Sequence, residues 1–181
     1  MKTIKLFKNA MFLFLAMLLS SAIFSQASSK DRKIVSDANY AKAQFTKGDA
    51  SMSNLFNSSY GYAIFPNVGK GAIGIGGAAG NGAVYEQGKL IGMSNMKQVS
   101  IGFQWGGQAY REIIFFETKA DLDRFVENKF DFSAQVSAVA VTAGASANVK
   151  FKNGVLVFTQ TKGGLMYEAS VGGQKFKFRK I

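Results

Sequence analysis

The sequence predicts an α+β fold, in which two N-terminal helices precede a strongly bent antiparallel β-sheet or barrel-like meander, with one helix inserted between strands. Three observations support this prediction. Apolar residues recur at helical spacing near the N-terminus and again around residues 119–127. From Tyr60 onward, short strand-like segments follow one another with Gly, Asn or Gln-Gly between them. Seven glycines between positions 69 and 82 are too dense for a helix and favour bent strands with close backbone approach.

Residues 1–27 have the features of a secretory signal peptide. Three lysines precede the apolar residues 10–19, and Ser25 and Ala27 place small side chains at the −3 and −1 positions of a cleavage site. The apolar stretch is too short to span the ~30 Å of hydrocarbon in a bilayer. We therefore expect cleavage after Ala27, export to the periplasm or the medium, and one mature domain of residues 28–181. An uncleaved anchor is the alternative.

Two helices are expected before the sheet. The first covers about residues 30–47, with Ser29 as its N-cap and Gly48 as its stop. Its apolar stripe consists of Ile34, Ala38, Ala41 and Phe45. Asp49 resembles the N-cap of a short second helix, in which three apolar side chains face one way: Met52, Leu55 and Phe56.

Strand-like segments then alternate with turn residues, as in an antiparallel meander. Pro66 is expected to end the first strand, because proline cannot donate to a strand ladder. The meander is expected to use residues 62–65, 72–79, 82–86, 89–94, 98–106 and 109–117. Thr118 and Asp121 form an Asp-substituted capping box that opens the inserted helix at 119–127.

The C-terminal part returns to strands. They are expected at residues 132–141, 149–152, 155–160 and 174–180. Asn153-Gly154 is the strongest local signal for a two-residue type I′ hairpin. Gly172-Gly173 predicts a second turn before the closing strand.

Composition argues against an enzyme. The chain has no histidine and no cysteine, so it lacks the usual general base, the commonest zinc ligand and any disulfide. The eleven carboxylates lie mostly at predicted caps, turns or exposed helical faces. Residues 74–79 fit a dinucleotide-binding glycine fingerprint, but a strand follows them where that site needs a helix. We therefore predict no catalytic residue, no cofactor and no metal site.

The chain is strongly basic, with a net charge of +11. Without the three leader lysines, 19 basic residues remain against 11 acidic ones, a net charge of +8. This charge favours an anionic partner but does not choose between lipid, polysaccharide and nucleic acid. Single-stranded nucleic acid binding uses basic and aromatic residues on one face. The strands here separate the two kinds of side chain, so we predict no nucleic-acid partner.

Two predicted strands carry basic residues on one side. In the closing strand, Lys175, Lys177 and Arg179 point to one face and the intervening phenylalanines to the other. Lys150 and Lys152 repeat this arrangement in the strand before the Asn-Gly turn. If the two strands are near neighbours, five cations share one surface, which is our candidate lipid-binding site. A solvated face whose lysines block edge aggregation is the alternative.

Four further residues complete the candidate lipid-binding site. Lys30, Arg32 and Lys33 lie on the polar side of the first helix, which could rest on a membrane as a basic amphipathic helix. Trp105 is the only tryptophan, and its polar and glycine neighbours could expose it at a membrane interface. For the first helix and for Trp105, the alternative is packing into the core.

The sequence resembles the SYLF domain family over roughly residues 34–177. The matching blocks are GYAIFP at 61–66, the glycine run, Gly-Xaa-Gln-Xaa-Gly-Gly-Gln at 102–108 and Lys-Gly-Gly-Leu at 162–165. The resemblance implies a non-enzymatic lipid-binding module, since SYLF proteins bind lipids, with eukaryotic members recognising phosphoinositides and some bundling actin. The Trp-Ser-Xaa-Pro element of eukaryotic members is replaced here by Met93, Ser94, Asn95 and Met96, so phosphoinositide specificity does not carry over. Actin is not an expected partner of an exported chain.

These observations predict an exported, non-enzymatic module that associates peripherally with anionic phospholipid through a basic sheet face. One alternative is a small integral outer-membrane β-barrel, with eight spans of ~10 residues. The predicted helices, and strands that are apolar on both faces, count against it. The other alternative is a protein-interaction scaffold in the cell envelope. The lipid head group and the oligomeric state are left open.

Overall fold

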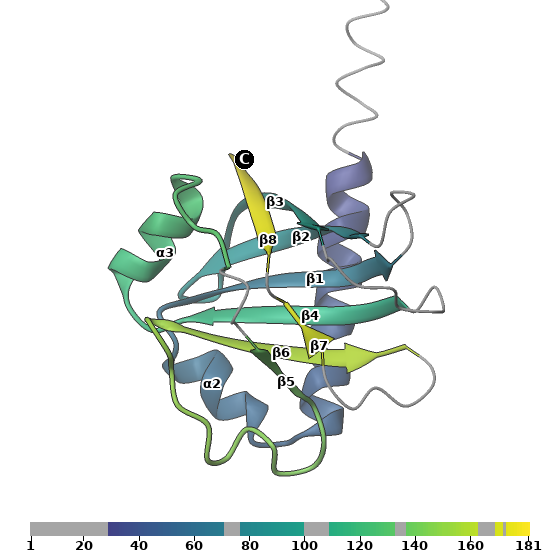
Figure 1. Cartoon of the computed structure of the whole chain (residues 1–181), viewed down its shortest axis with the longest axis vertical. Helices are drawn as coiled ribbons and strands as arrows, with labels where there is room; N and C mark the ends of the chain where they lie inside the picture. The colour runs from purple at the N-terminus through teal and green to yellow at the C-terminus, as the bar shows by residue number, and fades with distance from the viewer. Residues whose placement is uncertain (1–28, 71–76, 100–108, 133–136, 163–168, 172) are drawn as a thin grey trace, which may run out of the picture. The chain divides into compact units, whose positions relative to one another are not determined.

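The computed structural model describes residues 29–70, 77–99, 109–132, 137–162, 169–171 and 173–181 (Figure 1). The chain divides into two compact units, Met1–Lys33 and Ile34–Ile181. In the first unit, residues 29–33 are helical. The second unit is helical at residues 34–48, the N-terminal helix of this unit, and contains the whole sheet. The helix predicted at 30–47 is thus confirmed. Among the described residues, no helix has both the length and the apolar character needed to cross a membrane.

The sheet has eight strands in the order β7-β5-β6-β4-β1-β2-β3-β8. Their bounds are β1 Gly61–Lys70, β2 Gly77–Glu86, β3 Lys89–Val99, β4 Ala109–Phe116, β5 Ser137–Ala140, β6 Val155–Thr161, β7 Ala169–Ser170 and β8 Gln174–Lys180 (Figure 1). All neighbours pair antiparallel except β5 and β6, which are parallel. The predicted α+β class is confirmed. The described strands leave two edges, β7 and β8, so the sheet is bent and open, not closed into a barrel.

The bend follows from one short connection. β7 and β8 stand at opposite edges of the sheet, yet only residues 171–173 separate them along the chain. A flat sheet with strands about 4.8 Å apart would place these edges about 34 Å apart. Four residue steps, from Ser170 to Gln174, span at most about 14 Å. The sheet must therefore curl until its two edges approach each other.

Curling gives the sheet a concave and a convex face, and each has its own apolar cluster. The concave cluster is rich in aromatic rings, including Phe65, Phe116 and Phe176. α3 (Lys119–Val126) contributes Leu122 and Phe125 to it. The convex face is covered by the N-terminal helix and by α2 (Met52–Ser58). These helices bury five side chains there: Ala38, Ala41, Phe45, Met52 and Phe56.

The helix ends agree with the predicted capping at α3 and differ at α2. The Thr118 side chain accepts from the Asp121 amide, and the Asp121 carboxylate accepts from the Thr118 amide, so the predicted capping box is present. The N-cap of α2 is Ser51, not Asp49 as predicted. The Asp49 carboxylate instead accepts from the backbone amides of Ser51, at 3.0 Å, and Ser146, at 2.7 Å. Asp49 therefore ties the start of α2 to a turn 97 residues away.

β1 corrects the prediction that Pro66 ends the first strand. The strand runs on to Lys70. From Ile64 to Asn67, β1 advances by three residues while its partner β2 advances by two. The same mismatch of three residues against two occurs between β1 and β4. This is a β-bulge, the kind of site where a strand tolerates proline. The extra residue changes which side chains face inward, since Ala63 and Phe65 belong to the concave cluster before the bulge and Val68 after it.

The predicted strand at 149–152 is wrong. Of these residues only Lys152 forms a bridge, to Val155. The two-residue turn itself is present, because Asn153 and Gly154 have φ of 52° and 78°, as a type I′ turn requires. The predicted strand at 132–141 is described as β5 over Ser137–Ala140, since residues 133–136 lie outside the described part. The closing strand is confirmed as β8, and Gly173 has the positive φ of the predicted turn.

Replacing Gly82 by alanine tests the bulge. Gly82 lies opposite the bulge, and a Cβ there would come within 2.6 Å of the Ile64 carbonyl oxygen and 2.7 Å of the Phe65 ring. We expect Gly82→Ala to lower the free energy of unfolding by about 1–3 kcal/mol, the usual cost of overpacking. Urea unfolding measures this change. The matched control is Gly69→Ala on β1, where a Cβ would meet nothing within 4 Å. Equal stability of both variants would contradict the close approach.

Candidate functional site

β8 presents basic residues on one side, as the sequence predicts. Lys175, Lys177 and Arg179 are exposed, while Gln174 and Phe176 are buried. The inward side of the strand adds Phe176 to the concave cluster. The three cations therefore stand on the opposite side of the strand, away from the aromatic core.

β3 adds a cation that the sequence analysis missed. Lys97 lies directly opposite Lys175, and Asn95 lies opposite Lys177. Directly opposed residues of paired strands project to the same face. Lys97 is exposed, so it joins the three β8 cations. We call Lys97, Lys175, Lys177 and Arg179 the basic surface. Lys97 could have been found only from the β3–β8 register, which no local pattern encodes.

The three lysines of the basic surface, Lys97, Lys175 and Lys177, have no ion-pair partner among the described residues. Asp131 forms an isolated backbone bridge with Lys175, at the edge of β8 that faces away from β3. Like charges directly opposite on neighbouring strands destabilise a sheet. An anion bound between Lys97 and Lys175 would relieve this repulsion.

The other predicted residues do not join this surface. Lys150 and Lys152 are exposed, but they precede β6, and four strands separate β6 from β8 in the sheet order. The condition under which five cations would share one surface, that the two basic segments form neighbouring strands, is therefore not met. Lys30, Arg32 and Lys33 are exposed on the helical part of the first unit. Trp105 lies outside the described residues.

The outer edge of β8 is partly covered by the segment that follows α3. The Asn128 side-chain oxygen accepts a hydrogen bond of 2.6 Å from the Phe178 amide. The Phe132 amide donates to the Gln174 carbonyl at 3.0 Å, and the Gly173 amide donates to the Phe132 carbonyl at 3.0 Å. These bonds occupy positions that an added strand would need.

A buried carboxyl group lies inside the curl, whereas the sequence predicts most carboxylates at caps, turns or exposed helical faces. Glu112 on β4 is fully buried, and Gln174 on β8 donates to its Oε2 at 2.8 Å. Within the described residues, Glu112 Oε1 and Gln174 Oε1 have no hydrogen-bond partner. Burial raises the pKa of Glu112 to about 8, although the Gln174 bond lowers it in part. The carboxyl group is therefore mostly protonated at neutral pH, which lets it donate as well as accept. Side chains alternate along β4, so Glu112 points to the same face as Ile114 and Phe116. This alternation is the sequence signal from which its burial could have been predicted.

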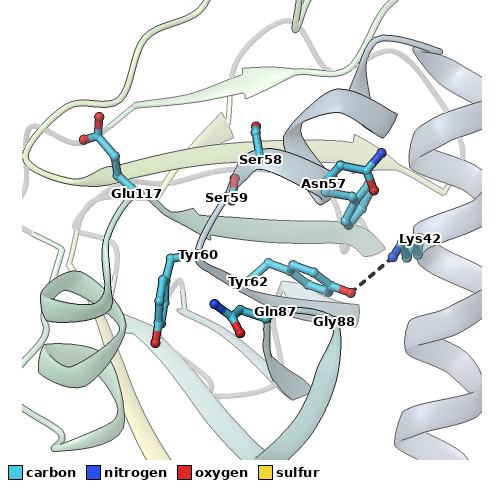
Figure 2. Close-up of a pocket in the computed structure, with 10 residues that line it drawn as sticks. Lys42, Asn57, Ser58, Ser59, Tyr60, Tyr62, Gln87, Gly88 and Glu117 are labelled. Carbon is cyan, nitrogen blue, oxygen red and sulfur yellow. Dashed lines mark hydrogen bonds between the residues drawn. The ribbon is translucent and has the colours of Figure 1, made fainter.

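A pocket of about 510 Å³ lies at the end of the sheet where the β2–β3 turn meets α2. Figure 2 shows the side chains that line it. They come from the N-terminal helix, the end of α2, the start of β1, the β2–β3 turn and the residue after β4: Lys42, Phe56, Asn57, Ser58, Ser59, Tyr60, Tyr62, Gln87, Gly88 and Glu117. Lys42 is the only cation among them, and Glu117 is the only carboxylate. No sequence pattern predicts this pocket, because five separate segments form it.

Comparison with known proteins identifies the C-terminal half of the chain. Residues 97–180 match the family model Ysc84, described as "Las17-binding protein actin regulator". This is the SYLF domain, and the family resemblance seen in the sequence is confirmed. The match covers 84 of the 181 residues of the chain. The family is one of lipid-binding domains. Its matched segment includes β8 and Lys97, and so contains the whole basic surface.

A curated relative extends the similarity. The chain is 29% identical over 124 residues to "Beta cell expansion factor A" of Aeromonas veronii. The aligned part is 67% of this chain and 47% of that protein. The chain therefore spans about half the length of this SYLF relative.

The buried Glu112 predicts a pH-dependent stability. The carboxyl group has a pKa of about 8 when folded and an ordinary pKa near 4.5 when unfolded. Between these values the folded state holds a proton that the unfolded state has lost, so stability falls as pH rises from about 4.5 to about 8. Below this window the stabilisation is fully present, and above it the loss is complete. We expect the free energy of unfolding, measured by urea denaturation, to fall through this window by an amount on the order of a few kcal/mol.

Two variants separate this effect from other titrations. Glu112→Gln should flatten the profile and be more stable than the natural protein at pH 8.5. The chain has no histidine, so no other side chain with an ordinary pKa titrates between pH 5.5 and 8. Glu117→Gln, which removes an exposed carboxylate just beyond the same strand, should leave the fall unchanged. A flat profile in the natural protein would contradict the assignment.

Proposed function

We propose that this protein is an exported, non-enzymatic module that binds anionic phospholipid at a membrane surface through the basic surface of β3 and β8. One observation supports it most strongly. Lys97 and Lys175 lie directly opposite each other without an ion-pair partner among the described residues. A phosphate between them replaces repulsion by two attractive contacts. The match of residues 97–180 to a model of a lipid-binding family agrees with this reading.

The strength of such binding follows from the number of cations. Near an anionic leaflet, each lysine or arginine contributes about 1 kcal/mol. Four cations are enough to hold a domain at the surface without insertion of a helix. Because the contacts are exposed, the attraction should weaken as salt shortens the screening length to ~8 Å at 0.15 M and ~3 Å at 1 M.

Export and peripheral attachment complete the proposal. The lysine-flanked apolar segment and the small residues at 25 and 27 support a cleaved leader. We place the mature protein in the periplasm or outside the cell, where it meets lipid head groups and not cytoskeletal actin. The covered edge of β8 makes strand addition by a protein partner less favourable there than lipid binding.

Vesicle co-sedimentation tests the proposal. The purified protein should sediment with phosphatidylglycerol-containing vesicles and not with phosphatidylcholine vesicles, and 1 M salt should release it. The triple variant Lys97→Gln, Lys175→Gln, Lys177→Gln should lose most of this binding. Its thermal stability should equal or exceed that of the natural protein, since the repulsion has been removed.

The double variant Lys150→Gln, Lys152→Gln is the matched control, because it removes exposed cations of the same kind beside β6. It should bind almost as well as the natural protein. Equal loss in both variants would show that net charge alone attracts the protein. Binding that is unchanged in the triple variant would overturn the basic surface, and capture of a protein without lipid would favour the scaffold alternative.

A further inference from the structure

The pocket beside α2 contains a cation that is held in place without a counter-ion. Lys42 Nζ donates to the Tyr62 hydroxyl at 3.1 Å, the bond drawn in Figure 2. The same nitrogen stands 4.4 Å from the centre of the Phe56 ring and 5.0 Å from that of Tyr62. Among the described residues Lys42 takes part in no ion pair. A lysine side chain normally loses much conformational freedom when it binds a ligand, but these contacts have already fixed the side chain of Lys42.

The rings that hold Lys42 are themselves rigid. Tyr62 is 3% exposed and stacks on Tyr85, with ring centres 5.0 Å apart. Phe56 packs edge-on against Tyr62 at 5.1 Å and against Phe115 at 5.0 Å. The ammonium group therefore has a defined position at the wall of the pocket. Such preorganisation favours recognition of a specific group over diffuse attraction.

Hydrogen-bond donors gather around this cation. An ammonium group has three donors, and the Tyr62 bond uses one. The Tyr62 oxygen accepts that bond, which leaves its own hydrogen to donate. Asn57 follows Phe56 in the chain and lines the same pocket, so its amide adds a donor. Three donors from different elements suit a tetrahedral phosphate, which has acceptors in several directions, better than a planar carboxylate.

The charges that line the pocket limit the ligand to one negative charge. Lys42 supplies one positive charge, and Glu117 places a carboxylate elsewhere on the wall. A dianionic phosphate monoester would leave one of its two charges uncompensated by Lys42. The volume of about 510 Å³ exceeds what a phosphate alone needs and lies in the range of small-molecule sites. Ser58, Ser59 and Gln87 line the remaining wall and can pair with hydroxyl groups. The Ser59 hydroxyl is buried and has no partner within the described residues.

We propose that this pocket binds a monoanionic phosphodiester that joins two small polar alcohols, the chemistry of a glycerophospholipid head group. As a head-group site it rests on the lipid-binding function proposed above. The same chemistry occurs in a free glycerophosphodiester released from lipid, so the experiment must separate the two sources. Lys42, Tyr62 and Asn57 hold the phosphate, and the serine hydroxyls meet the alcohol part.

Calorimetric titration of the full chain with glycerophosphoglycerol tests the pocket without any membrane. The natural protein should bind it with a dissociation constant of about 1 mM or tighter, and bind inorganic phosphate and glycerol much more weakly. Lys42→Gln should weaken binding at least about tenfold, because it removes a charged donor. Tyr62→Phe keeps the packed ring and removes only the hydroxyl, so it should weaken binding a few fold while the fold is retained.

Lys47→Gln is the matched control, since Lys47 is exposed on the same helix and does not line the pocket. It should bind like the natural protein. No binding of glycerophosphoglycerol at 10 mM would overturn the site. Equal affinity in Lys42→Gln, or binding of inorganic phosphate as tight as that of the diester, would also overturn it.

Vesicle assays with the same variants distinguish this inference from the proposed function. Lys42→Gln should still sediment with phosphatidylglycerol vesicles in a salt-sensitive way, because the basic surface is intact. The β3–β8 triple variant should keep its affinity for glycerophosphoglycerol. If the natural protein binds the soluble diester but no vesicles, the lipid source is wrong and the pocket takes the free diester. If it binds vesicles but not the diester, the basic surface stands and the pocket proposal fails.

Discussion

The curl of the sheet is the constraint on which the rest of the structure depends. Residues 171–173 join the two edge strands, and the Glu112–Gln174 bond links β4 to β8 across the interior although three strands lie between them in the sheet order. Together they close the concave face around a cluster of aromatic rings. The convex face is then left for the two N-terminal helices, and the outer sides of β3 and β8 are left for water. The position of both candidate sites follows from this arrangement.

The sequence predicted those features that local chemistry determines. The first helix, the capping box at Thr118, the Asn153-Gly154 turn and the one-sided pattern of β8 all depend on residues a few positions apart. The pairing of Lys97 with Lys175 and the burial of Glu112 depend on register and on which strands meet. Lys150 and Lys152 show the limit of local reasoning. Their alternation with Phe151 is real in the sequence, but the residues precede β6 without forming a strand of their own.

The two cationic features differ in how they recognise an anion. The basic surface offers several exposed cations on flexible side chains, an arrangement that attracts any anionic layer and is screened by salt. Lys42 is a single half-buried charge fixed by a hydroxyl and two rings, and this arrangement selects by shape and hydrogen bonding. A domain with both has one feature suited to reaching a membrane and another suited to distinguishing one head group from another.

The bulge at Pro66 makes the length of β1 as important as its composition. One extra residue reverses the phase of the strand, so that Val68 faces the aromatic interior and Asn67 faces the N-terminal helix, where it donates to Asp37 at 3.2 Å. Removal of one residue at the bulge would exchange the two faces of the second half of the strand. Val68 would then point outward and the Asn67 amide inward. Many substitutions on this strand alter one contact each, but a change in the number of residues exchanges two faces of the protein.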